Sequence, residues 1–99
     1  MLKVCVVGMG PIGNIHATAY SELPNVKLTA VCDIIQTRAD DAALKFEVRS
    51  YNDAGVMLTY EKPDVVSICT GGFEYSSDHF EPTIKALDFG AHVLCEKPI

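Results

Sequence analysis

The sequence predicts an α/β domain built on a doubly wound parallel sheet of about five strands. Short runs rich in Val, Ile, Leu and Cys are almost continuously apolar, which is typical of strands buried on both faces of a parallel sheet. Longer stretches with helical periodicity separate these runs, so right-handed crossovers between the strands give a doubly wound topology. The expected strands span residues 2–7, 26–32, 48–51, 64–70 and 91–95.

Helix signals lie between the strands in the required order. Pro11 opens the first helix, where its missing N–H is harmless because the first turn has no acceptor for it. Thr37 is placed to cap the second helix, and Asn52 or Asp53 to cap the third. Gly90 is placed to end the fourth. The expected helices span residues 11–23, 37–46, about 53–60 and 78–89.

Charge and composition exclude several classes of partner. The 99 residues carry a formal net charge of −5, whereas nucleic acids and anionic membranes are bound by clustered Lys and Arg. The hydrophobic fraction of 48% indicates a globular chain. No apolar run reaches the roughly 18–20 residues that a membrane helix needs, and the N-terminus lacks the features of a signal peptide. We therefore expect a cytoplasmic protein.

The four cysteines are expected to be buried thiols. Cys5, Cys32, Cys69 and Cys95 each lie inside a short apolar run, and no two form a Cys-x-x-Cys pair. Neither these cysteines nor the three histidines have the spacing of zinc ligands, so we expect no metal site.

A glycine-rich turn follows the first expected strand and opens the first helix. Gly8, Gly10 and Gly13 form the pattern G-x-G-x-x-G, whose glycines allow a tight turn, a close approach of backbone to a diphosphate, and close packing of helix on strand. The N–H groups at the helix start then meet the phosphate charge. The alternative is a plain β–α turn without a ligand.

Asp33 lies twenty residues after Gly13, at the end of the second expected strand. An acid at this place accepts hydrogen bonds from the adenosine ribose and repels a 2′-phosphate, which favours NAD over NADP. Arg38, five residues further on, could stack on adenine or offset a 2′-phosphate, and it could equally be a solvated helix residue. NADP therefore stays open.

The motifs GMGPIGNIHA, VCDI, KPDVVSICT and HVLCEKPI together resemble the Gfo/Idh/MocA family of nicotinamide-dependent sugar and polyol oxidoreductases. The resemblance covers the whole chain but only the N-terminal half of that family. It implies that residues 1–99 form an incomplete Rossmann-like NAD(P)-binding domain, without the C-terminal domain that carries the substrate pocket.

The resemblance also implies roles for individual residues. Contacts with the cofactor phosphates would come from Gly8, Met9, Gly10, Pro11, Ile12 and Gly13, and the ribose contact from Asp33. Further cofactor contacts would come from Thr70, Gly71, His79, Glu96 and Lys97, with Lys97 also facing the substrate hydroxyl as the catalytic residue. Gly71 and Gly72 depart from the family, whose members commonly show Thr-Pro after this strand. His79 and Lys97 could instead be surface residues.

Two functions fit these features. One is the nucleotide-binding half of an enzyme that transfers a hydride between NAD(P) and a sugar or polyol hydroxyl. The other is a non-catalytic, truncated or split NAD-binding module. Because the last strand would be an uncovered sheet edge, we expect a homo-oligomer or a partner chain to cover it.

Overall fold

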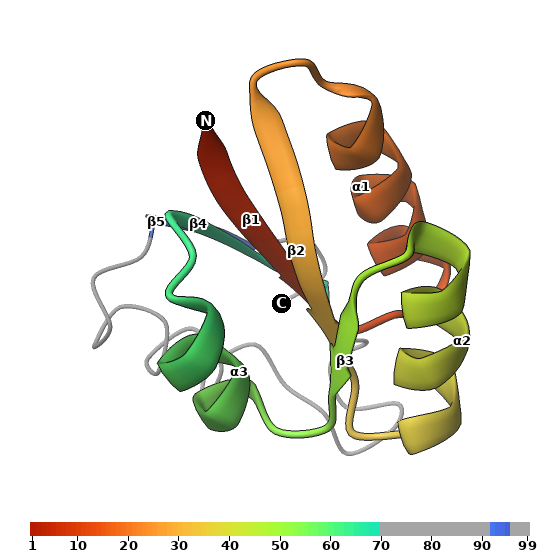
Figure 1. Cartoon of the computed structure of the whole chain (residues 1–99). Helices are drawn as coiled ribbons and strands as arrows, with labels where there is room; N and C mark the ends of the chain where they lie inside the picture. The colour runs from red at the N-terminus through yellow and green to blue at the C-terminus, as the bar shows by residue number, and fades with distance from the viewer. Residues whose placement is uncertain (70–91, 96–99) are drawn as a thin grey trace.

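The fold is a single parallel sheet with helices on both faces. The computed structural model describes residues 1–69 and 92–95. In these residues five strands lie in the order β3-β2-β1-β4-β5 (Figure 1). The strands are β1 (Leu2–Val7), β2 (Val26–Cys32), β3 (Arg49–Tyr51), β4 (Val65–Ile68) and β5 (His92–Cys95), and the helices are α1 (Pro11–Glu22), α2 (Gln36–Phe46) and α3 (Ala54–Glu61). The doubly wound parallel sheet predicted from the sequence is confirmed.

Strand bounds agree with the sequence for β1 and β2, whereas β3 and β4 are shorter than predicted. Val48 is outside β3 because its N–H donates to the carbonyl of Ala43, which closes the last turn of α2. Asp64 is outside β4 because it forms a reciprocal backbone link to Lys3: its carboxylate accepts the Lys3 N–H at 2.9 Å, and its own N–H donates to the Lys3 carbonyl at 2.8 Å. The backbone N–H groups of Val48 and Asp64 are thus hydrogen-bonded, although neither residue belongs to a strand.

The helix starts follow the prediction for α1 and α3 but not for α2. Pro11 begins α1, and the Asp53 carboxylate caps α3 by accepting the N–H of Val56 at 3.0 Å. The predicted cap by Thr37 is wrong, because α2 already begins at Gln36 and Ile35 lies at its cap position without a side-chain hydrogen bond. The expected helix over 78–89 lies outside the described residues.

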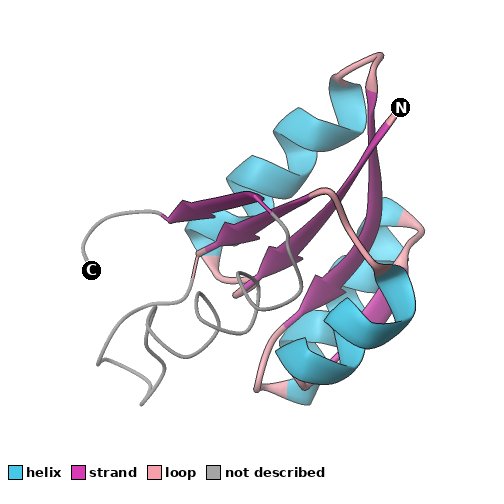
Figure 2. Ribbon diagram, turned by 90° about the vertical axis from the view of Figure 1, so that its left-hand side faces the viewer, coloured by secondary structure: helices cyan, strands magenta, loops and turns pink. Residues whose placement is uncertain are grey.

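The two faces of the sheet bury separate apolar clusters. Helices α1 and α2 cover one face and α3 covers the other, so the sheet is the middle layer (Figures 1 and 2). The cluster under α3 contains Cys5, Val7, Ala30, Cys32, Met57, Leu58, Val66 and Ile68. The cluster under α1 and α2 contains Val6, Met9, Ala17, Leu28, Val31, Ala42 and Cys69. Strands β1 and β2 contribute to both clusters, as their nearly continuous apolar sequences predict, whereas β4 contributes Val66 and Ile68 to the cluster under α3.

Strand β2 carries one extra residue relative to β1. Val4 pairs with Leu28 and Cys5 pairs with Ala30, so Thr29 is the bulged residue. A bulge changes the direction of a side chain. Here it places the Thr29 hydroxyl 3.4 Å from the Cys5 sulfur, on the face covered by α3.

Three of the four cysteines are buried thiols, as predicted: Cys5, Cys32 and Cys69. The side chain of Cys95 lies outside the described part of the chain. Burial raises the pKa of the Cys5 thiol to about 11, because the thiolate would lose its hydration among apolar neighbours. In the part of the chain that the structure describes, no helix has the length and hydrophobicity to cross a membrane.

The raised pKa of Cys5 predicts a loss of stability at alkaline pH. Below the ordinary thiol pKa of 9.0, Cys5 is protonated in both the folded and the unfolded state. Between that value and about 11, only the unfolded thiol ionises, which favours unfolding. The free energy of unfolding should fall across this interval by on the order of 2 kcal/mol.

Urea titrations at successive pH values measure this loss. In Cys5→Ala the decline should be flatter, even though the variant is less stable throughout. The pKa of Tyr51 is also raised, by burial and by its hydrogen bond to Glu61, so its ionisation contributes to the same decline. The variant Tyr51→Phe is the control for that contribution. An equally steep decline in wild type and Cys5→Ala would contradict the assignment.

Candidate functional site

The glycine-rich turn lies at the carboxyl edge of the sheet, between β1 and α1. Gly8 has a φ of 93°, a backbone conformation that favours glycine. Its N–H donates to the carbonyl of Cys32 at 2.7 Å, and the N–H of Cys69 donates to Val7 at the same distance. The ends of β2 and β4 therefore hold the start of the turn from both sides.

Gly13 sets the distance between α1 and this turn. A Cβ atom at Gly13 would lie 1.8 Å from the carbonyl oxygen of Gly8, a separation that no side chain allows. Gly10 differs, since a Cβ there would meet only Nη1 of Arg38, at 3.6 Å. The third glycine of the motif is thus required by packing, whereas the second leaves open space above the turn.

The N-terminus of α1 presents backbone donors without a side-chain cap. The cap residue is Gly10, which has no side chain to accept them, and Pro11 has no N–H to offer. The first intrahelical bond runs from the Asn14 N–H to the Gly10 carbonyl at 3.0 Å. The N–H groups of Ile12 and Gly13 precede it, so a first-turn anion can be bound there.

Asp33 has a structural role that the sequence analysis missed. Its carboxylate accepts the Met9 N–H through Oδ2 and the Ile35 N–H through Oδ1, each at 2.8 Å. It is only 6% exposed, and its own N–H donates to the Tyr51 carbonyl at 3.0 Å. Asp33 therefore joins the glycine turn to the ends of β2 and β3. The bond to Ile35 has a local sequence signal. An Asp side chain often accepts the N–H of the residue two positions later, which is the pattern of an Asx turn.

Several of the predicted cofactor residues are brought together at this edge. The predicted phosphate-contact residues 8–13 and the acid Asp33 share it, and Arg38 reaches the glycine turn from α2, as its separation from Gly10 shows. Met9 is a partial exception, because its N–H is taken by Asp33 and its side chain is buried in the core. The other predicted site residues lie outside the described residues: Thr70, Gly71, His79, Glu96 and Lys97.

A buried serine ties α1 to β4 beside this edge. Ser67 is completely buried, and its hydroxyl forms a short hydrogen bond with the Tyr20 hydroxyl and lies 3.4 Å from Nδ1 of His16. The rings of His16 and Tyr20 meet edge to face. No partner for His16 could be predicted from the sequence, because the serine that meets it is fifty-one residues away. Among residues 1–69 and 92–95, no three His, Cys, Asp or Glu side chains lie together as metal ligands.

Comparison with known proteins decides the family. Residues 2–99 match the model of the Gfo/Idh/MocA group, described as an oxidoreductase family with an NAD-binding Rossmann fold. The chain belongs to this family. The Gfo/Idh/MocA motifs found in the sequence and the parallel sheet of the structure agree with that assignment.

Similar Gfo/Idh/MocA proteins act on sugars and polyols, according to their names. The chain is 38% identical over 99 residues to D-glucoside 3-dehydrogenase from Escherichia coli strain K12, covering 98% of this chain and 27% of that protein. It is 33% identical over 101 residues to inositol 2-dehydrogenase from Salmonella typhimurium strain LT2, covering 99% and 29%. The chain thus spans little more than a quarter of these relatives.

Solved structures of dehydrogenases and related proteins have the same fold. One is scyllo-inositol dehydrogenase from Lactobacillus casei with bound NAD(H) and scyllo-inositol, which has a TM-score of 0.83 and 30% identity over 99% of this chain and 28% of that one. Another is GenD2 from gentamicin A biosynthesis in complex with NAD, with a TM-score of 0.88 and 29% identity over 98% and 27%. The chain is therefore an NAD-binding Rossmann domain.

The same substitution at the two glycines should destabilise the fold to very different extents. Gly13→Ala should lower the free energy of unfolding by about 3 kcal/mol, because the new methyl group collides with the Gly8 carbonyl. Gly10→Ala, the matched control, should lower it by less than about 1 kcal/mol, since Gly10 has an extended backbone and open space. Chemical denaturation measures both values. Equal losses would contradict the packing role of Gly13.

Proposed function

We propose that this chain is the cofactor-binding part of a dehydrogenase that transfers a hydride between NAD and a hydroxyl-bearing carbon of a sugar or polyol. The observation that carries the proposal is the shared location of an uncapped helix N-terminus and a buried acid at the carboxyl edge of the sheet. Doubly wound sheets bind their ligands at this edge. The names of the relatives support the substrate class.

The described residues suit a dinucleotide in three ways. The absence of a side chain at Gly10 lets a diphosphate approach the first turn of α1, where the N–H groups of Ile12 and Gly13 can donate. Asp33 uses one N–H donor on each carboxylate oxygen, and a carboxylate has about four acceptor sites, so lone pairs remain for ribose hydroxyls. Arg38 lies at Gly10, where its charge faces the phosphates.

The chemistry divides between cofactor and protein. NAD supplies the hydride acceptor when it is bound, and the protein must orient it and move one proton from the substrate hydroxyl. We propose that Lys97 holds the substrate hydroxyl and that Thr70, Gly71, His79 and Glu96 contribute to the nicotinamide end. Thr70, His79, Glu96 and Lys97 match the family pattern, whereas Gly71 follows Thr70 where family members commonly have Pro.

The substrate pocket is proposed to lie outside these 99 residues. The relatives are more than three times as long as the chain, which supports a second domain in the whole protein. Either that domain or a second copy of the protein would cover the β5 edge of the described sheet. If this chain acts without such a domain, its function is that of a non-catalytic NAD-binding module. A cytoplasmic location stays a prediction.

Asp33→Asn tests the proposed ribose contact. Loss of the charge should raise the dissociation constant for NADH about tenfold, while NADPH binding should change less because the repulsion of its 2′-phosphate also disappears. Calorimetric titration with each nucleotide measures the change. The control is Asp53→Asn, which alters the carboxylate that caps α3, away from the site. It should change neither the NADH nor the NADPH dissociation constant. Equal losses for NADH and NADPH would leave Asp33 only its role in holding the glycine turn.

Gly10→Ala tests the phosphate contact separately. The variant should keep its fold, since the new methyl group meets only Arg38 at an ordinary distance. Its methyl group would, however, occupy the space where the diphosphate approaches, so NADH binding should weaken at least about tenfold. Unchanged NADH binding in a folded Gly10→Ala protein would contradict the proposed position of the cofactor.

A further inference from the structure

A second polar site lies at the opposite end of the sheet from the glycine turn. Lys3 on β1 and Lys27 on β2 are paired directly in the parallel register, and Arg49 begins the neighbouring strand β3. Because the strands are parallel, these three cations lie toward the amino end of the sheet, with Arg49 level with Ala30, three residues beyond Lys27 on β2. Together with Met1, Thr29, Tyr60 and Glu61 they line an open hollow of about 410 Å³, within the size range of small-molecule sites.

The cations of this hollow are incompletely neutralised. Glu61 is buried and pairs with Arg49, whose Nη1 lies 3.2 Å from its Oε2. Within residues 1–69 and 92–95, neither the Lys3 nor the Lys27 ammonium forms an ion pair, and Asp64 binds the backbone N–H of Lys3 instead. The side chains of the wall, three cations and one carboxylate, have a net charge of 3 − 1 = +2, in a chain whose total is −5. Like charges that lie opposite each other on neighbouring strands, as Lys3 and Lys27 do, destabilise the sheet.

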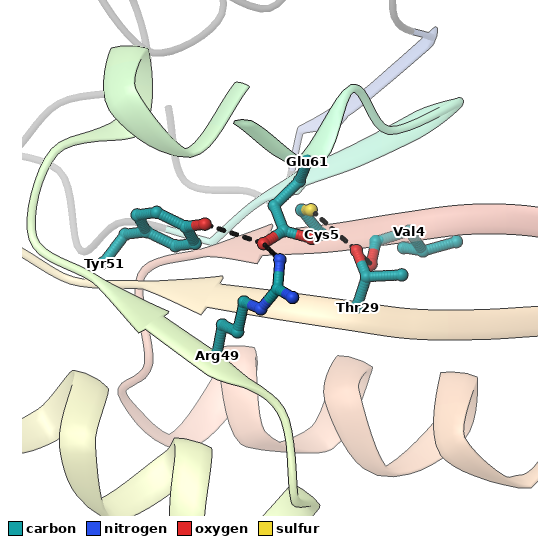
Figure 3. Close-up of polar contacts among 6 residues, drawn as sticks. All are labelled: Val4, Cys5, Thr29, Arg49, Tyr51 and Glu61. Carbon is teal, nitrogen blue, oxygen red and sulfur yellow. Dashed lines mark hydrogen bonds and ion pairs between the residues drawn. The ribbon is translucent and has the colours of Figure 1, made fainter. Parts of the chain in front are cut away.

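The hollow is built by more than flexible lysines. The Tyr51 hydroxyl donates to Oε2 of Glu61 at 2.7 Å, so Glu61 receives two donors and fixes the Arg49 guanidinium beside β3 (Figure 3). Arg49 remains 74% exposed, and its fork of five N–H donors exceeds what one carboxylate oxygen accepts. The β2 bulge adds the Thr29 hydroxyl next to Cys5. The result is a guanidinium held by Glu61 and a hydroxyl beside two ammonium groups that form no ion pair within the described part of the chain.

We propose that this hollow binds a small molecule through a phosphate dianion. A phosphate carries about two negative charges near neutral pH and matches both the +2 wall and the fork of Arg49. An uncharged sugar would leave the two lysines without partners. The site lies at the amino edge of the strands, whereas the proposed cofactor contacts lie at the carboxyl edge, so both can be occupied at once.

Amide shifts in NMR spectra during titration with inorganic phosphate test the proposal, at constant ionic strength set with potassium chloride. Saturable shifts are expected at residues 3, 27, 29 and 49, apart from any at residues 8–13. Lys27→Gln and Lys3→Gln should each weaken phosphate binding roughly threefold to fivefold. Lys27→Arg should retain binding, and Lys45→Gln, which removes an exposed lysine from α2, should not change it.

The outcomes separate this site from the glycine turn. Shifts confined to residues 8–13, or equal weakening by Lys27→Gln and Lys45→Gln, would overturn the proposal. So would linear shifts that also appear with potassium chloride alone. A parallel titration with glycerol 3-phosphate distinguishes the source: tighter binding than inorganic phosphate indicates a phosphorylated metabolite, and equal binding indicates free phosphate. Loss of NADH binding in the Asp33 or Gly10 variants would leave this result unaffected.

Discussion

The structure depends on the close approach of helix α1 to strand β1. Gly13 lies so near the Gly8 carbonyl that no side chain fits between them, and this contact sets the position of the helix N-terminus. The same contact keeps the first-turn N–H groups of α1 at the sheet edge, where they have no side-chain cap. The absence of a side chain at Gly13 is therefore required for helix packing, and the same packing sets the position of the N–H groups that would bind the ligand.

Asp33 extends this constraint across the sheet edge. Its two carboxylate oxygens fix the glycine turn and the start of α2, while its N–H reaches the end of β3. A buried carboxylate with two charge-assisted hydrogen bonds gives the turn one conformation before any ligand arrives. The turn is thus organised in advance, which reduces the conformational entropy lost when a dinucleotide binds.

The two ends of the sheet carry opposite chemistry. At the carboxyl edge the donors are backbone N–H groups and Arg38, beside one buried acid, whereas toward the amino edge they are the side chains of Lys3, Lys27 and Arg49. Parallel strands produce this division because all of them begin at one edge and end at the other. Two anions can therefore bind to one small domain without sharing a residue.

Sequence patterns were sufficient for the layers but not for every contact. The apolar runs predicted β1 and β2 to the residue, and G-x-G-x-x-G placed the turn, because these signals are local. The role of Asp33 in holding Met9, the Ser67 contact with His16, and the cation cluster were missed. Each joins residues from different strands or helices, as in the pair Arg49 and Glu61, so it exists only after the chain has folded.

A crystal structure with NADH tests the central claim most directly. The diphosphate is expected within hydrogen-bonding distance of the N–H groups of Ile12 and Gly13, with a ribose hydroxyl on the Asp33 carboxylate and the Met9 bond intact. A diphosphate bound elsewhere, or an Asp33 carboxylate without ribose contact, would contradict the cofactor site derived from this fold.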